Sequence, residues 1–142
     1  PEEEFKTIGG LPYLYELNLR RFAKANEANI ASRKLSIHLW KHDSNSFHLK
    51  GIWVDKRYML LTGNNLNPRA WKLDLENGIF IQDNYNHLAE KFQAEVDNIL
   101  QHTQLICTYK QLDKVDSYPT EVQKLIRKIT RVKADRVLKQ IL

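Results

Sequence analysis

The sequence holds a single cysteine, Cys107, among its 142 residues. One thiol excludes an internal disulfide and a cysteine-based metal site, and it fits the reducing, cytoplasmic setting that we expect for this chain. We expect Cys107 itself to be a small buried side chain. Long apolar runs are also missing, since no stretch approaches the roughly 20 residues that span a bilayer.

Glycine and proline are scarce, with five and four residues, and the sequence shows neither internal repeats nor low-complexity segments. Apolar residues make up 42% of the chain and charged residues 27%, which is typical of a soluble globular protein rather than a disordered or fibrous one. The length predicts one domain of ordinary size. Because the chain begins at Pro1 without a methionine, we expect it to be a piece of a longer protein or a processed product.

Acidic residues are rare from Glu121 onward, where seven basic residues meet only two acidic ones. This segment accounts for the whole net charge of +5, because the rest of the chain carries fifteen residues of each sign. We therefore divide the chain into a body at 1–116 and a basic amphipathic helix at 117–142. The basic residues that we expect to face an anionic membrane are Lys124, Arg127, Lys128 and Arg131. The alternative is a helix that packs on the body and leaves its basic face in water.

The periodicity of the body predicts a mixed α/β fold. Apolar residues recur at helical spacing over 11–29, with Gly9, Gly10 and Pro12 at the expected helix start. Alternation predicts strands at 34–41, 47–54 and 57–62, which we expect to form an antiparallel meander with turns at 42–46 and 55–56.

A loop is expected at 63–71, where glycine, proline and three asparagines follow one another closely. It is followed by a strand at 75–83 and a helix at 86–103. A short apolar segment at 105–109 then leads to the basic terminal helix.

The stretch FHLKGIWVD, residues 47–55, places an imidazole and an ammonium in an apolar strand. Residues two apart on a strand share a face, so His48 and Lys50 should point the same way. An imidazole acts as nucleophile or proton donor near neutral pH, whereas an ammonium holds a phosphate oxygen. The pair therefore indicates chemistry at phosphorus.

Other polar residues are expected near this pair. Asn64, Asn65 and Asn67 lie on the loop that should return to the same end of the sheet, and their amides can donate to phosphoryl oxygens. Glu76 can accept from the second nitrogen of the imidazole and fix its tautomer. Asp55, where the strand turns, either secures the turn or supports the basic site by its charge.

The remaining histidines carry weaker signals. His38 and His42 lie four residues apart, a spacing that suits a metal site on a helix. Because 34–41 is predicted to be a strand, we expect both to be structural or exposed to solvent. His87 and His102 are expected on a helix surface.

The spacing His48-x-Lys50-x4-Asp55 matches the HxKxxxxD motif of the phospholipase D superfamily. The family's later Gly-Ser-x-Asn stands here as Thr62–Gly63–Asn64–Asn65, so the asparagine agrees and the Gly-Ser pair does not.

The resemblance continues beyond this motif. Asn67 and Arg69 match a frequent Asn-x-Arg continuation, and Glu76 matches a glutamate before an apolar strand. Residues 48–83 strongly resemble the second motif region of the bacterial phosphatidylserine synthases of this superfamily. The likeness runs through the basic tail and so covers nearly the whole chain.

The resemblance implies half of a pseudo-two-fold α/β/α sandwich, with a mixed sheet flanked by helices. It implies transfer of a phosphatidyl group from CDP-diacylglycerol to L-serine with release of CMP, by two histidines and without a metal or other cofactor. One histidine would form a phosphatidyl-histidine, and the other would move the protons. His48, Lys50, Asp55, Asn65 and Glu76 would be the catalytic set.

Substrate contacts would come from Asn64, Asn67 and Arg69. The chain holds only one copy of the motif, so a second half-domain is expected, in the same full-length chain or in a homodimer. Such an enzyme would associate peripherally with an anionic membrane surface.

Two other functions stay open. One is a phospholipase D-like hydrolase or a cardiolipin-synthase-type transferase. The other is a non-catalytic basic module that binds anionic lipid or nucleic acid.

Overall fold

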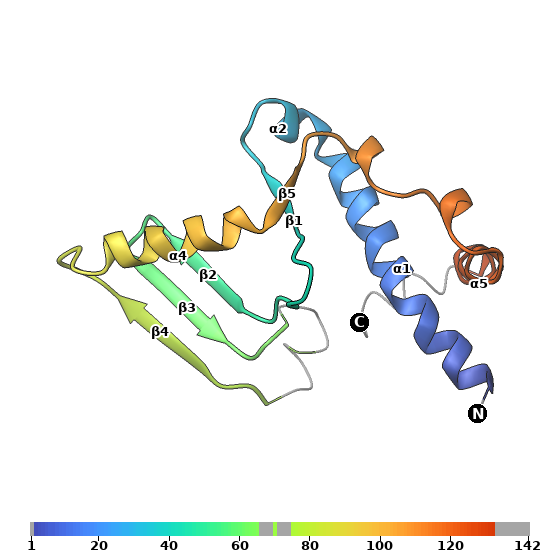
Figure 1. The fold of residues 1–142 in the computed structure, drawn as a ribbon, viewed down its shortest axis with the longest axis horizontal. Coiled ribbons are helices and arrows are strands. Elements are labelled where there is room, and N and C mark those ends of the chain that lie inside the picture. Colours follow the sequence, from blue (N-terminus) through green and yellow to red (C-terminus); the bar gives the residue numbers. More distant parts are fainter. Residues whose placement is uncertain (1, 66–69, 71–74, 133–142) are drawn as a thin grey trace. The chain divides into compact units, whose positions relative to one another are not determined.

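The computed structural model describes residues 2–65, 70 and 75–132, which fall into two compact units that alternate along the chain. The helical unit comprises residues 2–39 and 105–132, and the sheet unit comprises residues 40–104. Figure 1 follows both along the chain. The division at residue 117 that the charge pattern suggests stays a prediction.

The helical unit contains most of the helices. Its elements, with the strands that join it to the sheet unit, are α1 (Glu2–Ala25), α2 (Glu27–Ala31), β1 (Ile37–Trp40), β5 (Thr103–Ile106), the 3-10 helices η1 (Tyr109–Gln111) and η2 (Val115–Ser117), and α5 (Thr120–Arg131). The helix predicted over 11–29 is confirmed, but its predicted start is wrong. α1 begins at Glu2 and includes Gly9, Gly10 and Pro12, since a proline removes one backbone donor without ending a helix whose flanking turns persist.

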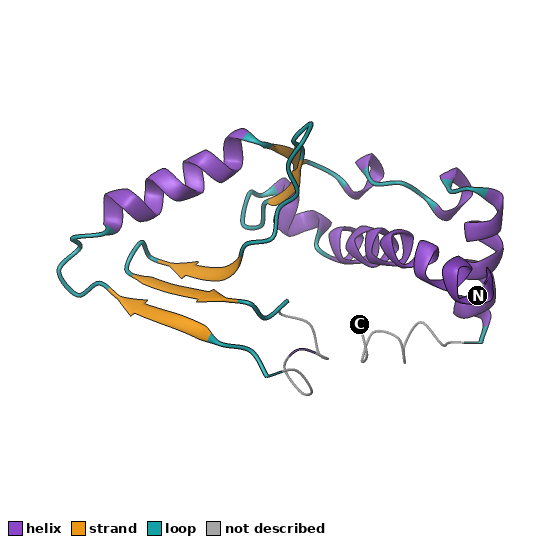
Figure 2. Ribbon diagram, turned by 60° about the horizontal axis from the view of Figure 1, so that its bottom comes forward, coloured by secondary structure: helices purple, strands orange, loops and turns teal. Residues whose placement is uncertain are grey.

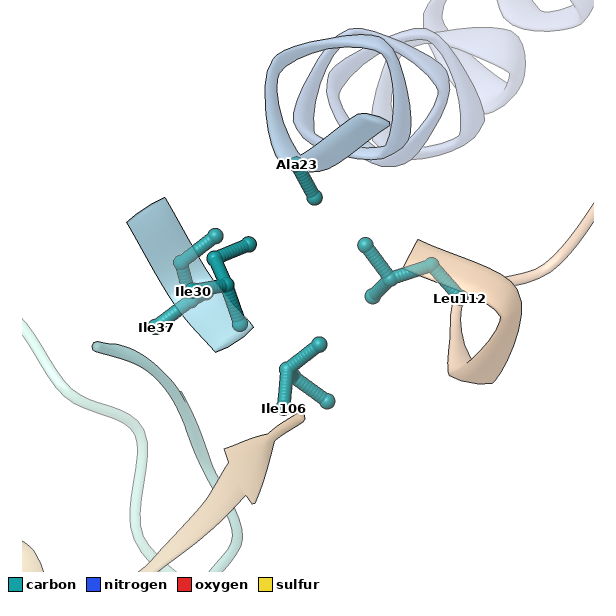
Figure 3. Packing of buried hydrophobic residues seen from close by; sticks show 5 residues of the cluster. All are labelled: Ala23, Ile30, Ile37, Ile106 and Leu112. Carbon is teal, nitrogen blue, oxygen red and sulfur yellow. The ribbon is translucent and has the colours of Figure 1, made fainter. Parts of the chain in front are cut away.

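Five apolar side chains from separate segments of the helical unit meet in one core. Figure 3 shows them pointing toward one another from α1, α2, β1, β5 and the end of η1. They are Ala23, Ile30, Ile37, Ile106 and Leu112. This cluster explains the alternation predicted over 34–41, because the residue of β1 that it buries is Ile37.

Cys107 does not join this core, and the prediction that it is buried is wrong. Its side chain is exposed, directly after the buried Ile106. Neighbours in an extended segment point to opposite sides, so burial of Ile106 turns Cys107 outward. Its backbone N–H donates to the side-chain oxygen of Gln111 at 2.7 Å, which secures the turn into η1.

The basic helix α5 packs on α1 through its apolar face. Ile126 is 1% exposed and meets Leu17 and Tyr118 in a second cluster. The Tyr118 ring lies 4.9 Å from that of Tyr13, centroid to centroid. Of the two arrangements left open by the sequence, the structure has the helix packed on the protein with exposed basic residues.

The sheet unit contains β2 (Lys50–Val54), β3 (Tyr58–Thr62), β4 (Gly78–Gln82) and helix α4 (Ala89–Gln101). The three strands form an antiparallel sheet in chain order, so the predicted hairpins are confirmed. Asp55, Lys56 and Arg57 make the β2–β3 turn, in which Asp55 and Lys56 have positive φ of 54° and 55° and the N–H of Arg57 donates to the backbone oxygen of Val54. The predicted helix over 86–103 is confirmed as α4.

The predicted meander is wrong in its first strand. β1 pairs with β5, not with β2, and forms a separate two-stranded sheet. Alternation of apolar residues fixes which face of a strand is buried but not which strand lies beside it. In β1, the burial of Ile37 beside Ile106 selects the distant partner.

One face of the three-stranded sheet lies beneath α4, as the two views in Figures 1 and 2 agree. Met59 in the sheet and Phe92 in the helix are each 6% exposed. The strand alternation turns Ile52, Val54 and Phe80 to the opposite face, where they remain 45%, 45% and 64% exposed. The described residues thus leave an apolar sheet face open to solvent.

Asp83 connects β4 to α4 through backbone hydrogen bonds. Its two carboxylate oxygens accept from the N–H groups of His87 at 3.0 Å and Leu88 at 2.7 Å. These bonds, that to Leu88 above all, hold the pKa of Asp83 below its usual 3.8 although burial opposes them.

We expect Ile126→Ala to lower the free energy of unfolding by about 2–5 kcal/mol, because it opens a cavity where α5 meets α1. Urea denaturation measures the change. Val132→Ala is the matched control, since Val132 ends the same helix and is 67% exposed; it should change stability by no more than about 0.5 kcal/mol. Equal effects of both changes would contradict the packing described for α5.

A second prediction concerns acid stability. The lowered pKa of Asp83 means that its contribution to stability is present above the unfolded-state value and is lost as the pH falls through the lower folded-state value. Asp83→Asn should therefore reduce stability at pH 7 and flatten the loss of stability below pH 3.8. Thermal unfolding from pH 7 to pH 2.5 tests this. Asp97→Asn is the control, since it changes an exposed residue of α4. Its stability should depend on pH as that of the wild type does.

Candidate functional site

The register of the three strands brings several predicted site residues to one end of the sheet. Lys50, the first residue of β2, pairs with Thr62, the last of β3, and Thr62 pairs with Gly78, the first of β4. The segment that follows Thr62 and the segment that leads into Gly78 therefore both lie at the end of the sheet where Lys50 is found. Asn64 and Asn65 lie on the first segment and Glu76 on the second.

A small hydrogen-bond network ties these two segments together. The Thr62 hydroxyl donates to the backbone oxygen of Asn77 at 3.1 Å and accepts from the backbone N–H of Asn64 at 3.0 Å. The backbone N–H of Gly63 also donates to the oxygen of Asn77, at 3.3 Å. The turn at Asn64 and Asn65, which we call the asparagine turn, is thus fixed to the segment that leads into β4. Sequence reasoning gave Thr62 no role, although threonine before glycine and asparagine is typical of such hydroxyl-bonded turns.

Glu76 lies directly against Gly63. A methyl group built on Gly63 would stand 2.5 Å from Glu76 Oε2, so any side chain there would displace the carboxylate. Gly63 occupies the position at which the phospholipase D resemblance expects serine. The departure from the motif therefore has a structural counterpart, because the space beside the backbone is occupied by Glu76.

His48 and Lys50 are accessible from solvent. Lys50 is partly buried and His48 is exposed. The strand predicted over 47–54 is shorter than expected, since β2 begins at Lys50, and His48 therefore lies on the loop that enters the strand. We call residues 41–49 the His48 loop.

The structure does not bring Asp55 to this end of the sheet. Asp55 is exposed in the turn after β2, so the five residues of that strand, roughly 16 Å at strand spacing, separate it from His48. Its positive φ places it among the conformations that aspartate tolerates better than most residues. The geometry favours the turn-securing role of the two that the sequence left open.

Two predicted substrate contacts, Asn67 and Arg69, lie outside the described residues.

The four basic residues assigned to the membrane are all exposed on α5 in the helical unit. They are Lys124, Arg127, Lys128 and Arg131. Arg127 pairs with Asp116 at 2.8 Å and Lys124 with Glu121 at 3.1 Å. Both pairs are largely exposed and hence contribute little to stability.

Within residues 2–65, 70 and 75–132, histidine, cysteine and acidic side chains form no group of three that could hold a metal ion. In the same part of the chain, no helix combines the length and the apolar composition needed to cross a bilayer.

His42 is not simply a solvent-facing residue. It is partly buried, and its ring stacks on Trp40 with centroids 5.9 Å apart. The His102 ring packs against both, at 4.9 Å from His42 and 5.4 Å from Trp40. This cluster stands at the base of the His48 loop.

Comparison with known proteins agrees with the resemblance seen in the sequence. A CDP-diacylglycerol–serine O-phosphatidyltransferase of Haemophilus influenzae is 51% identical over the whole chain, and one of Escherichia coli is 50% identical. A CDP-diacylglycerol–glycerol-3-phosphate 3-phosphatidyltransferase of Schizosaccharomyces pombe is 27% identical over 83% of the chain. The chain spans about a third of the length of its bacterial relatives, 31% and 32%.

The fold agrees as well. The crystal structure of phosphatidylserine synthase from Haemophilus influenzae superposes with a TM-score of 0.89 at 51% identity, and the match covers 94% of this chain and 30% of that one. The predicted fold class, an α/β phospholipase D-like half, is thereby confirmed. A family model described as "Cardiolipin synthase, PLD-like domain" matches residues 13–100. That match takes in more than half of the chain and every described residue of the sheet end, and the chain accordingly belongs to this family of PLD-like domains.

Proposed function

We propose that this chain supplies one half of the active site of an enzyme that transfers a phosphatidyl group from CDP-diacylglycerol to L-serine. The proposal is carried by one observation. The strand register brings Lys50, the asparagine turn and Glu76 to the same end of the sheet, and the exposed His48 precedes Lys50 by two residues. The choice of reaction is supported by two bacterial relatives that are named for it and share about half of their residues with this chain over the matched region.

The reaction needs two balanced displacements. In the first, a histidine nitrogen bonds to phosphorus, the bond from phosphorus to the CMP oxygen breaks, and the second histidine gives a proton to the departing CMP. In the second, the hydroxyl of serine loses its proton to that same histidine and bonds to phosphorus, which releases the first histidine. His48 fills one of these two roles.

The neighbours of His48 would stabilise the charge that develops on the phosphoryl oxygens. The ammonium of Lys50 would attract such an oxygen by about 4 kcal/mol at 4 Å and an effective dielectric near 20, before desolvation costs. The amides of Asn64 and Asn65 would donate hydrogen bonds without adding charge. Glu76 would accept from the second imidazole nitrogen and orient the ring.

Three predicted residues play other parts in this proposal. Asn67 and Arg69 remain substrate contacts on the strength of the resemblance. Asp55 would act as a positioning residue, because it secures the β2–β3 turn and with it the register that places Lys50.

A complete site requires a second histidine from another half-domain. We infer that this half belongs to the same full-length polypeptide or to a second copy. The open sheet face at Ile52, Val54 and Phe80 supports the inference, because apolar faces of this kind are commonly covered by protein. The chain's coverage of only a third of its relatives is consistent with it.

We also propose that the basic face of α5 contacts an anionic membrane. Its exposed Lys124, Arg127, Lys128 and Arg131 lie on one face of the helix, at spacings of three and four residues. The apolar face of α5 is already packed on α1, so the contact would rely on charge, at about 1 kcal/mol per basic residue, rather than on insertion. The proposed contact implies peripheral attachment, and the cytoplasmic side remains the expectation drawn from the single cysteine.

The acceptor decides between this function and its closest alternative. The Schizosaccharomyces pombe relative is named for transfer to glycerol 3-phosphate, so that compound, L-serine and water should be compared in one assay with CDP-diacylglycerol. Serine should give the dominant product. Accumulation of phosphatidic acid instead would favour a hydrolase.

We expect His48→Ala in the full-length polypeptide to lower kcat by about 10²–10⁴-fold, because it removes a group that bonds to phosphorus or moves its protons. Lys50→Ala should lower kcat by about 10²–10³-fold through lost charge stabilisation. CMP release in mixed micelles measures both.

The control is His87→Ala, which removes an exposed imidazole but keeps the backbone N–H bonded to Asp83. It should retain wild-type activity. A folded His48→Ala variant with activity near that of the wild type would refute the proposed role.

For the membrane contact, replacement of both Lys128 and Arg131 by Gln should weaken binding to anionic vesicles by about 30-fold, which corresponds to about 2 kcal/mol. Vesicle sedimentation at several salt concentrations measures the effect. The control neutralises Lys34 and Lys110, two exposed lysines outside α5, and should bind as the wild type does. Binding to nucleic acid but not to vesicles would favour the non-catalytic module.

A further inference from the structure

The His48 loop is attached at its base by two hydrogen bonds. The N–H of Lys41 donates to the backbone oxygen of His102 at 2.7 Å, which continues the pairing of β1 with β5. The indole N–H of Trp40 donates to the backbone oxygen of Asn45, also at 2.7 Å. Most side chains of the loop are exposed, so no apolar core holds it in place.

His42 provides the internal support of this loop. Its Nδ1 atom accepts from the backbone N–H of Ser44 at 3.2 Å and from that of Asn45 at 3.1 Å. Because a backbone N–H can only donate, Nδ1 must carry a lone pair and no proton. The arrangement therefore requires a neutral imidazole with its proton on Nε2. That atom lies 3.4 Å from the side-chain amide of Asn45, which accepts the Nε2 proton when the amide is turned to present its oxygen. An imidazolium would lose both hydrogen bonds.

Ring contacts extend this support toward His48. The His42 ring stacks nearly parallel to that of Trp40, with 8° between the planes. Trp40 in turn contacts the ring of Phe47, with centroids 5.0 Å apart. Phe47 immediately precedes His48, so the contacts that start at His42 reach the backbone that carries the candidate catalytic imidazole.

We propose that neutral His42 is a positioning residue that holds His48 in its active arrangement, and that protonation of His42 releases the loop. The proposal rests on the phosphatidyl-transfer function proposed above. The ionisable group packed against His42 from another element is His102, and Lys41 and Asp43 adjoin it in the chain. A positive charge on His42 would thus arise against a second imidazole, with one basic and one acidic neighbour in the chain.

The tautomer gives a test that does not depend on activity. In the full-length polypeptide labelled with ¹⁵N-histidine, the His42 signals are identified by their loss in His42→Asn. At pH 7.5 we expect Nδ1 to resonate as an unprotonated acceptor and Nε2 as a protonated nitrogen. A protonated Nδ1 at this pH would overturn the proposal.

Two substitutions separate the hydrogen bonds from the ring. His42→Asn places an amide oxygen where Nδ1 stands and cannot titrate, so it should keep kcat within about threefold of the wild type. His42→Phe keeps a ring beside Trp40 but offers no acceptor, and should lower kcat by about 10- to 100-fold with little change in KM for CDP-diacylglycerol. His87→Phe is the matched control and should leave kcat unchanged.

The pH profile completes the test. As the pH falls, wild-type kcat should decline relative to that of His42→Asn, over the same pH range in which the ¹⁵N signals of His42 change. Parallel profiles for the two proteins, or full activity in His42→Phe, would refute the positioning role. Should His42→Phe not fold, as judged by circular dichroism, the tautomer and the His42→Asn profile still decide the question.

An inactive wild-type protein, or an active His48→Ala variant, would refute the proposed function instead. The ¹⁵N result would be unaffected in either case, so the two failures can be told apart.

Discussion

The antiparallel register of β2, β3 and β4 is the constraint on which the candidate site depends. Lys50 pairs with Thr62, and Thr62 pairs with Gly78. The start of β2, the end of β3 and the start of β4 therefore lie side by side. A slip by one residue would move Lys50 to the opposite face and separate it from the asparagine turn. Two features oppose such a slip, the tight turn at Asp55–Lys56 and the burial of Met59 beneath α4.

The two sides of the site are held by forces of different strength. Lys50, the asparagine turn and Glu76 depend on ladder hydrogen bonds and on the Thr62 network. His48 depends on an exposed loop supported by one imidazole and two aromatic rings. The proposed phosphate contacts would therefore be the more robust part of the site, and the placement of His48 the more sensitive part.

The sequence predicted those features that are encoded by neighbouring residues. The helical period of 86–103 and the alternation of 57–62 locate α4 and β3, and Asp55–Lys56 marks a turn. The pairing of strands that are distant in the chain could not be predicted from the sequence. The pairing of β1 with β5 depends on burial of Ile37 beside Ile106, which alternation within one strand does not reveal.

The candidate site shows the same division. His48, Lys50 and Asn65 were predicted from a motif with fixed spacing, and Glu76 from its match to a later glutamate of the same family. The support that His42 and Trp40 give to the loop was not predicted, because it depends on a backbone turn and on a ring from the end of α4. The spacing of His38 and His42 suggested only a metal site, and the strand predicted over 34–41 spoke against it.

The alternation of the two units along the chain has a consequence for biosynthesis. Residues 40–104 interrupt the helical unit, so α1 leaves the ribosome about a hundred residues before Tyr118 and Ile126, the residues that cover its Leu17. Closure of such a distant contact is entropically costly and slow. While those hundred residues are synthesised, the apolar face of α1 around Leu17 therefore stays uncovered, and during that interval a chaperone would have the most to protect.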